Sequence, residues 1–118
     1  ILITHDLGVV SDFADRVAVM YAARVVETAP AEALFAAPRH PYTEGLLASL
    51  PRLDATAERL PSIPGQVPPP FALPPGCRFA PRCAYAKALC GMALPPLLDA
   101  GDGRAAACIR LVGYAVAP

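Results

Sequence analysis

The chain has 118 residues with ten acidic and ten basic side chains, so its formal net charge at pH 7 is zero. Nucleic-acid-binding domains and membrane-binding polybasic segments usually carry a basic excess, so the charge balance argues against both. Hydrophobic residues make up 55% of the chain, which is enough for a folded core. The sequence contains no apolar stretch of the roughly 18 residues that a membrane-spanning helix needs.

The first residues predict a strand followed by a helix. Residues 1–4 form a short apolar run, which is typical of the end of a buried strand. Apolar side chains recur at helical spacing over residues 6–14, and Asp6 is expected to cap this helix. Because the chain begins inside the expected strand and without Met, we interpret it as a fragment.

A β-hairpin is expected next. Residues 16–21 and 24–27 have the composition and alternation of strands, and they are close enough in sequence to pair. Ala22-Ala23 would form the turn, although two alanines are a poor hairpin turn sequence.

Prolines delimit two further short helices. Pro30 suits the first position of one helix, which Pro38 ends. The second helix is expected to begin at residues 40–43 and to end at Pro51, with leucines on its apolar face.

The composition divides the chain into three parts. Residues 1–50 have the pattern of the last portion of an α/β domain. Residues 51–75 are rich in proline and predict an extended connector. Residues 76–118 contain all four cysteines, and their apolar end, residues 109–116, predicts a short strand.

His5 lies between the expected first strand and the helix that follows, where α/β proteins often bind ligands. This position alone is weak evidence, because most such histidines are ordinary turn residues. With its neighbours the signal is more specific: residues 4–10 and 14–21 resemble the switch (H-loop) segment of ABC-type ATPases. The continuation, above all PRHPYT at residues 38–43, looks like the oligopeptide/dipeptide (peptide/nickel) importer branch of that family.

The resemblance implies an α/β fold: the C-terminal fragment of a P-loop ABC ATPase domain, followed by a small Pro-rich, Cys-containing irregular extension. His5 would be the switch histidine that contacts the γ-phosphate in the full-length protein. The Walker A, signature and Walker B motifs are not in these residues, so ATP and Mg are expected only in the full-length protein. We expect the fragment alone to be inactive as an ATPase.

The resemblance also implies partners and a location. The expected partners are two permease subunits, a second ATPase subunit and an extracytoplasmic peptide-binding protein, with no nucleic acid. The subunit would lie at the cytoplasmic face of the cell membrane, held there by the permease subunits. We expect the isolated fragment to self-associate, because its first strand lacks the sheet that would cover it.

The four cysteines are separated by five, six and seventeen residues, so the usual zinc-knuckle spacing is missing. Disulfides, unrelated buried thiols, a zinc site and an iron–sulfur cluster all remain open on this spacing. Arg78 and Arg82 are expected to offset thiolate charge and to lower the pKa of the thiols. The family resemblance implies a [4Fe–4S] cluster at four positions: Cys77, Cys83, Cys90 and Cys108. Zinc is the alternative occupant of the same four thiols if no cluster is bound.

Three other residues and one alternative function complete the sequence analysis. His40 has no second histidine near it in the sequence, so a structural role is expected, with the Tyr42 ring packed beside it. Ala23 and Ala29 stand where the family usually has glycine, at expected turns that favour positive φ. The alternative function is a stand-alone iron–sulfur or zinc module with a structural or redox-sensing role.

Overall fold

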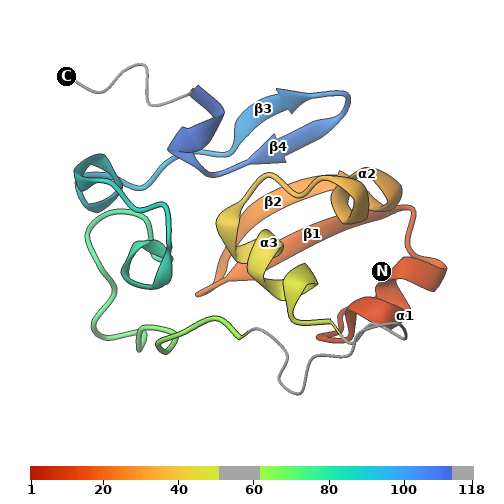
Figure 1. Ribbon diagram of the computed structural model, residues 1–118, viewed down its shortest axis with the longest axis horizontal. Coiled ribbons are helices and arrows are strands. Elements are labelled where there is room, and N and C mark those ends of the chain that lie inside the picture. Colours follow the sequence, from red (N-terminus) through yellow and green to blue (C-terminus); the bar gives the residue numbers. More distant parts are fainter. Residues whose placement is uncertain (51–61, 113–118) are drawn as a thin grey trace.

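The computed structural model describes residues 1–50 and 62–112, which form a small α/β structure around one four-stranded antiparallel sheet (Figure 1). The strands lie in the order β1-β2-β4-β3. Their bounds are Arg16–Tyr21 for β1, Arg24–Pro30 for β2, Leu98–Gly101 for β3 and Arg104–Ala106 for β4. The sheet thus combines a hairpin from the first third of the chain with a hairpin near its end.

The hairpin of β1 and β2 confirms the sequence prediction, and its turn explains how two alanines suffice. Ala22 and Ala23 have φ angles of 47° and 65°, so both occupy the left-handed region that a two-residue turn of this kind requires. The positive φ expected at Ala23 is therefore confirmed. The same expectation for Ala29 is wrong, because Ala29 lies inside β2 and is fully buried.

Helix α1, Leu7–Phe13, confirms the predicted helix and its cap. The Asp6 carboxylate accepts hydrogen bonds from the backbone N–H groups of Gly8 at 2.9 Å and Val9 at 3.4 Å. The strand predicted for residues 1–4 is not formed, and Ile3 is 92% exposed. No other described strand lies beside these residues to accept their backbone hydrogen bonds, so the apolar run stays outside the sheet.

Helices α2, Ala31–Ala36, and α3, Pro41–Ala48, lie against the β1–β2 hairpin (Figure 1). Pro30 is the N-cap of α2 rather than its first helical residue, because β2 continues to that position. His40 caps α3: its Nδ1 accepts a hydrogen bond from the backbone N–H of Tyr42 at 3.0 Å.

The remaining described residues are mostly irregular, with three short 3₁₀ helices: η1 (Ala80–Arg82), η2 (Ala88–Gly91) and η3 (Ile109–Val112). The strand predicted for residues 109–116 is wrong over its first part, where η3 lies instead. The Leu111 N–H donates to the Cys108 carbonyl at 3.2 Å, which turns the chain away from the sheet. Residues 113–116 and residues 51–61 of the predicted connector lie outside the described residues.

One core holds these pieces together. It is formed by Val19, Tyr21, Val26, Ala29, Leu34 and Phe79. Phe79 belongs to the cysteine-containing segment, and its ring centroid lies 5.2 Å from that of Tyr21 and 5.4 Å from that of Tyr42. The cysteine-containing segment is therefore packed directly on the hairpin and on α3.

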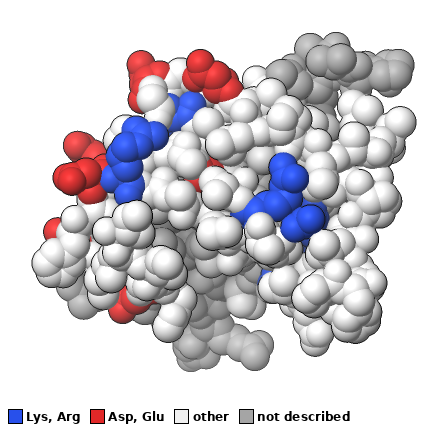
Figure 2. Space-filling view, turned by 180° about the vertical axis from the view of Figure 1, so that it is seen from behind, with Lys and Arg blue, Asp and Glu red and all other residues white. Residues whose placement is uncertain are grey.

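The charged side chains are unevenly spread over the surface. On the face shown in Figure 2, acidic and basic side chains gather toward one side, and a separate basic group lies among uncharged residues. Within residues 1–50 and 62–112, no helix is long and apolar enough to cross a membrane.

Candidate functional site

The four cysteines, far apart in sequence, line one small cavity of about 20 Å³. All four are free thiols, and each is partly buried. Cys77 and Cys83 flank η1, Cys90 lies in η2, and Cys108 follows β4. The structure therefore brings Cys77, Cys83, Cys90 and Cys108 to the wall of one cavity.

Close backbone packing brings Cys77 and Cys90 together. The Cys77 N–H donates to the Cys90 carbonyl at 2.7 Å. A Cβ atom on Gly76 would lie 2.1 Å from that same carbonyl oxygen, so only glycine allows the two segments to approach this closely.

Each sulfur accepts backbone hydrogen bonds. The Tyr85 N–H donates to Cys83 Sγ and the Lys87 N–H to Cys90 Sγ, both at 3.4 Å. The Cys77 sulfur accepts from Phe79 and Ala80, and the Cys108 sulfur accepts from Arg110. Hydrogen bonds of this kind stabilise the thiolate form and tune metal-bound sulfur.

Burial nevertheless dominates the acidity of these thiols. It raises the pKa of Cys77, Cys83 and Cys108 above the usual thiol value. The expected lowering of the pKa by Arg78 and Arg82 is therefore wrong.

Both arginines are engaged by backbone carbonyls instead. The Arg78 guanidinium donates to the Ala22 carbonyl, and that of Arg82 donates to the carbonyls of Ile63 and Pro64. The positive charges that act on the thiols belong to Arg24, near Cys77, and Arg110, near Cys83 and Cys108.

The four cysteine sulfurs are suitable metal ligands by their chemistry, but they lie too far apart to hold a metal ion as they stand. Four sulfurs that accept N–H groups around one cavity are the ligands that zinc and iron–sulfur clusters prefer. Within the described ranges, however, no three His, Cys, Asp or Glu side chains lie close enough together to hold a metal ion. The sulfurs would have to draw inward to bind one.

His40 also lines the cavity, and its contacts are structural. Its side chain is 1% exposed, caps α3, and packs edge-on to Phe79 with a centroid distance of 5.8 Å. Burial, together with the charge of Arg110, lowers its pKa to about 4, so the ring is neutral at pH 7.

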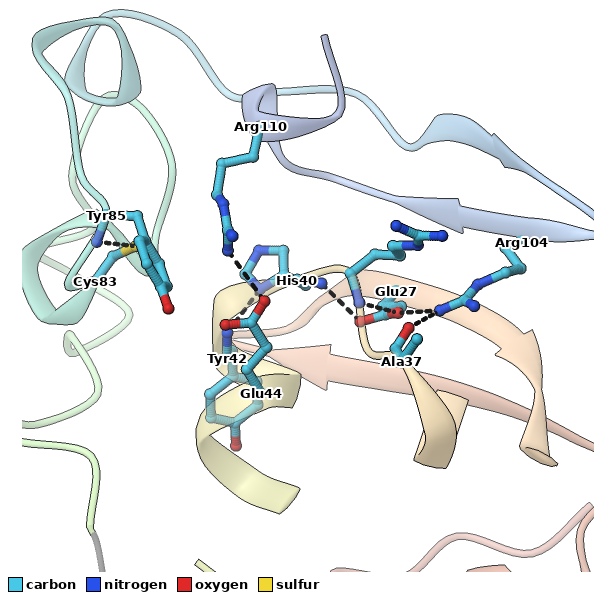
Figure 3. A network of polar contacts seen from close by, with 10 residues as sticks. Glu27, Ala37, His40, Tyr42, Glu44, Cys83, Tyr85, Arg104 and Arg110 are labelled. Atoms are coloured by element: carbon cyan, nitrogen blue, oxygen red, sulfur yellow. Dashed lines mark hydrogen bonds and ion pairs between the residues drawn. The ribbon is translucent and has the colours of Figure 1, made fainter. Parts of the chain in front are cut away.

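A buried polar network behind His40 was not predicted from the sequence (Figure 3). The Glu27 carboxylate accepts the backbone N–H groups of Arg39 at 2.7 Å and His40 at 2.9 Å. It also lies 3.7 Å from Arg104 Nη2, and the Arg104 guanidinium donates to the Ala37 carbonyl. An acidic residue on the core-facing side of β2 is the signal that could have revealed this network.

A second ion pair lies at the wall of the cysteine cavity. Arg110 Nη1 lies 3.1 Å from Glu44 Oε1, and its guanidinium stacks 3.9 Å above the Tyr85 ring (Figure 3). Arg110 thereby connects α3 with the segment between η1 and η2.

His5 lies away from this centre. It is exposed in the turn before α1, and it is not among the residues that line the cysteine cavity. The predicted phosphate contact and the predicted thiol site are therefore separate features.

The family model and the similar proteins that match this chain point to the same family. Residues 26–90 match the family described as oligopeptide/dipeptide transporter, C-terminal region. A Brucella abortus protein named as a peptide import ATP-binding protein is 56% identical over 108 residues, covering 92% of this chain and 32% of the relative. The Bacillus subtilis oligopeptide transport ATP-binding protein AppD is 56% identical over 108 residues, covering 92% of this chain and 33% of that protein.

A Brucella ovis protein named as a peptide import ATP-binding protein is 51% identical over 116 residues, with 93% of this chain and 34% of the relative covered. The chain thus spans about a third of the length of these relatives. The matched residues include most of β2, all of α3 and three of the four cysteines. The chain belongs to the oligopeptide/dipeptide transporter C-terminal region family.

Proposed function

We propose that this chain is the C-terminal part of the ATP-binding subunit of an importer that couples ATP hydrolysis to the uptake of oligopeptides or dipeptides. One observation carries the proposal. The chain aligns over 92% of its length, at 56% identity, with proteins named for peptide import and ATP binding. The stand-alone metal or iron–sulfur module is not favoured, because these relatives are about three times longer than the aligned region.

In the full-length subunit we assign His5 to the nucleotide. We expect its imidazole to donate a hydrogen bond to the γ-phosphate of ATP and to help hold the attacking water. Its exposed position before the capped start of α1 supports this role, since an exposed side chain is accessible to a nucleotide. ATP and Mg would be bound mainly by segments outside this chain.

The proposed partners follow from the same function. They are two permease subunits, a second ATPase subunit and an extracytoplasmic peptide-binding protein. The subunit would work at the cytoplasmic face of the membrane through its contacts with the permease. The exposed apolar residues before α1, Ile1, Leu2 and Ile3, support the further proposal that the isolated chain self-associates.

We also propose that Cys77, Cys83, Cys90 and Cys108 hold a [4Fe–4S] cluster, or zinc in its place. Bound there, a cluster would supply a structural cross-link or a one-electron redox centre. The common cavity and the N–H groups that point at each sulfur support the proposal.

Metal analysis of anaerobically purified protein tests the cysteine site. About four irons and four sulfides per chain are expected for the cluster, and one zinc for the alternative occupant. Cys77→Ser should lower this content sharply, whereas Met92→Ser, at the exposed residue that follows η2, should not. Equal metal content in wild type and Cys77→Ser would contradict the assignment.

Peptide uptake tests the main proposal. Deletion of the gene should abolish uptake of a labelled dipeptide or oligopeptide by the cell, and the full-length gene should restore it. A gene carrying His5→Ala should not restore uptake, because the γ-phosphate contact is lost. Unchanged uptake after deletion, for every peptide length tried, would contradict the proposed function.

A further inference from the structure

A second cavity of about 20 Å³ lies beside the cysteine cavity, and two arginines line it. Arg24 begins β2, and Arg78 follows Cys77 in the segment that packs on the hairpin turn. The rest of the wall is mostly apolar, with Val26, Phe79 and Leu94, and it also includes His40 and Cys77, which line the cysteine cavity as well. Two positive charges therefore border one small, largely apolar space.

Neither arginine has a carboxylate partner in the described part of the chain. The ion pairs found there join Glu27 with Arg104 and Glu44 with Arg110. Arg78 is oriented by its hydrogen bond to the Ala22 carbonyl, which still leaves donors of its guanidinium available. The Arg24 side chain makes no hydrogen bond and no carboxylate ion pair with any described residue, and its charge acts on the neighbouring Cys77 thiol.

The burial of both residues makes this arrangement unfavourable without a counter-charge. Both side chains are partly buried, so their charges are less well hydrated than those of a freely exposed arginine. Two like charges beside one cavity also repel each other. An anion bound between the two arginines would offset both the lost hydration and the repulsion.

We propose that Arg24 and Arg78 form a binding site for an oxyanion, either a carboxylate or a phosphate group. The planar guanidinium presents paired donors that match the two oxygens of either group. The cavity is small, so it would admit the anionic end of a ligand and leave the rest outside. The proposal concerns this chain alone and does not depend on the transport function.

Ligand-induced stabilisation of the full chain tests the site. Sodium phosphate, compared with sodium chloride at equal ionic strength, should raise the Tm in a saturable way. Arg24→Gln should weaken this binding at least about tenfold, because it removes charge-assisted hydrogen bonds to the anion. The variant should still fold, since the Arg24 side chain makes no hydrogen bond and no carboxylate ion pair with the described residues.

Arg16→Gln is the matched control. The Arg16 guanidinium donates to the Gly103 carbonyl at 2.8 Å and does not line the cavity, so this variant should keep the wild-type response. The measured quantity is the difference in the phosphate-induced Tm shift between the wild type and Arg24→Gln. Phosphate that binds elsewhere on the protein raises both Tm values equally and does not change this difference.

Two further ligands identify the source of the anion. Alanyl-alanine carries a free carboxylate, and its C-terminal amide does not. A shift with alanyl-alanine but not with the amide would assign the site to a peptide carboxylate, and a shift with phosphate alone would assign it to a phosphate group. The proposal is overturned if neither anion gives a saturable shift that Arg24→Gln reduces, or if the amide acts as well as the acid.

Discussion

At the scale of single residues, the cysteine site depends on one glycine as much as on its thiols. Gly76 brings the backbone of Cys77 to within hydrogen-bond distance of Cys90. Gly91 lies in the same contact but faces open space, since a Cβ there would meet nothing within 4 Å. The two glycines are therefore a natural pair for substitution.

Gly76→Ala should destabilise the fold by about 3 kcal/mol, because the new methyl group would collide with the Cys90 carbonyl. Gly91→Ala should change the free energy of unfolding by less than about 1 kcal/mol. Urea denaturation of both variants measures the difference. Equal effects of the two substitutions would show that the close approach at Gly76 is unimportant.

His40 should make stability depend on pH. Its pKa falls from 6.5 in the unfolded chain to about 4 in the fold, so the unfolded state binds more protons between these values. Stability should therefore fall by up to about 3 kcal/mol as the pH drops from 6.5 to 4.

Measurement of the Tm against pH tests this dependence on His40. His40→Asn keeps a cap acceptor and removes the titrating ring, so it should flatten the slope between pH 4 and 6.5. A wild-type slope in His40→Asn would contradict the buried neutral histidine.

At the scale of elements, local signals in the sequence predicted the hairpin, the three helices and the capping role of Asp6. These features depend on contacts between near neighbours, which periodicity and capping residues report directly. The pairing of β2 with β4 could not be predicted, because Glu27 and Ala106 are distant in sequence and β4 is only three residues long. The strand predicted for residues 1–4 is not formed, although its local sequence is suitable for a strand, because no described strand lies beside it to pair with.

The hairpin turn offers a direct test of backbone strain. Ala23 has a φ of 65°, which is unfavourable for alanine and free for glycine, so Ala23→Gly should stabilise the fold by about 0.5 kcal/mol. Ala29→Gly should destabilise it by about 1 kcal/mol, because Ala29 is a buried strand residue without positive φ. Thermal unfolding of the two variants should give shifts of opposite sign, and shifts of the same sign would contradict this assignment of the turn.

At the scale of the whole molecule, the cysteine-containing segment and the α/β part share one core and one sheet. Phe79 packs against both Tyr21 and Tyr42, and the Glu27 carboxylate connects β2 with β4 and with the start of α3. The sequence suggested that the thiols would form one centre, and the structure gathers them around one cavity. Burial of the thiols, which reverses the expected pKa shift, was not visible in the sequence because it depends on the packing of distant segments.

Glu27→Gln should test how strongly the two parts are joined. It would leave the buried Arg104 guanidinium without its counter-charge, so we expect a loss of about 3 kcal/mol in the free energy of unfolding. Glu32→Gln, on the exposed face of α2, should change stability by less than about 0.5 kcal/mol. If both variants unfold at the same urea concentration as the wild type, the network does not hold the parts together.

The most direct test of the central claim is the rate of MgATP hydrolysis by the full-length subunit assembled with its permease in vesicles. We predict that His5→Ala lowers kcat at least about a hundredfold, because under the proposed assignment His5 positions the γ-phosphate and the attacking water. The variant should still bind ATP and assemble. Hydrolysis by His5→Ala at the wild-type rate, or no hydrolysis by the wild-type assembly, would contradict the claim that this chain completes a transport ATPase.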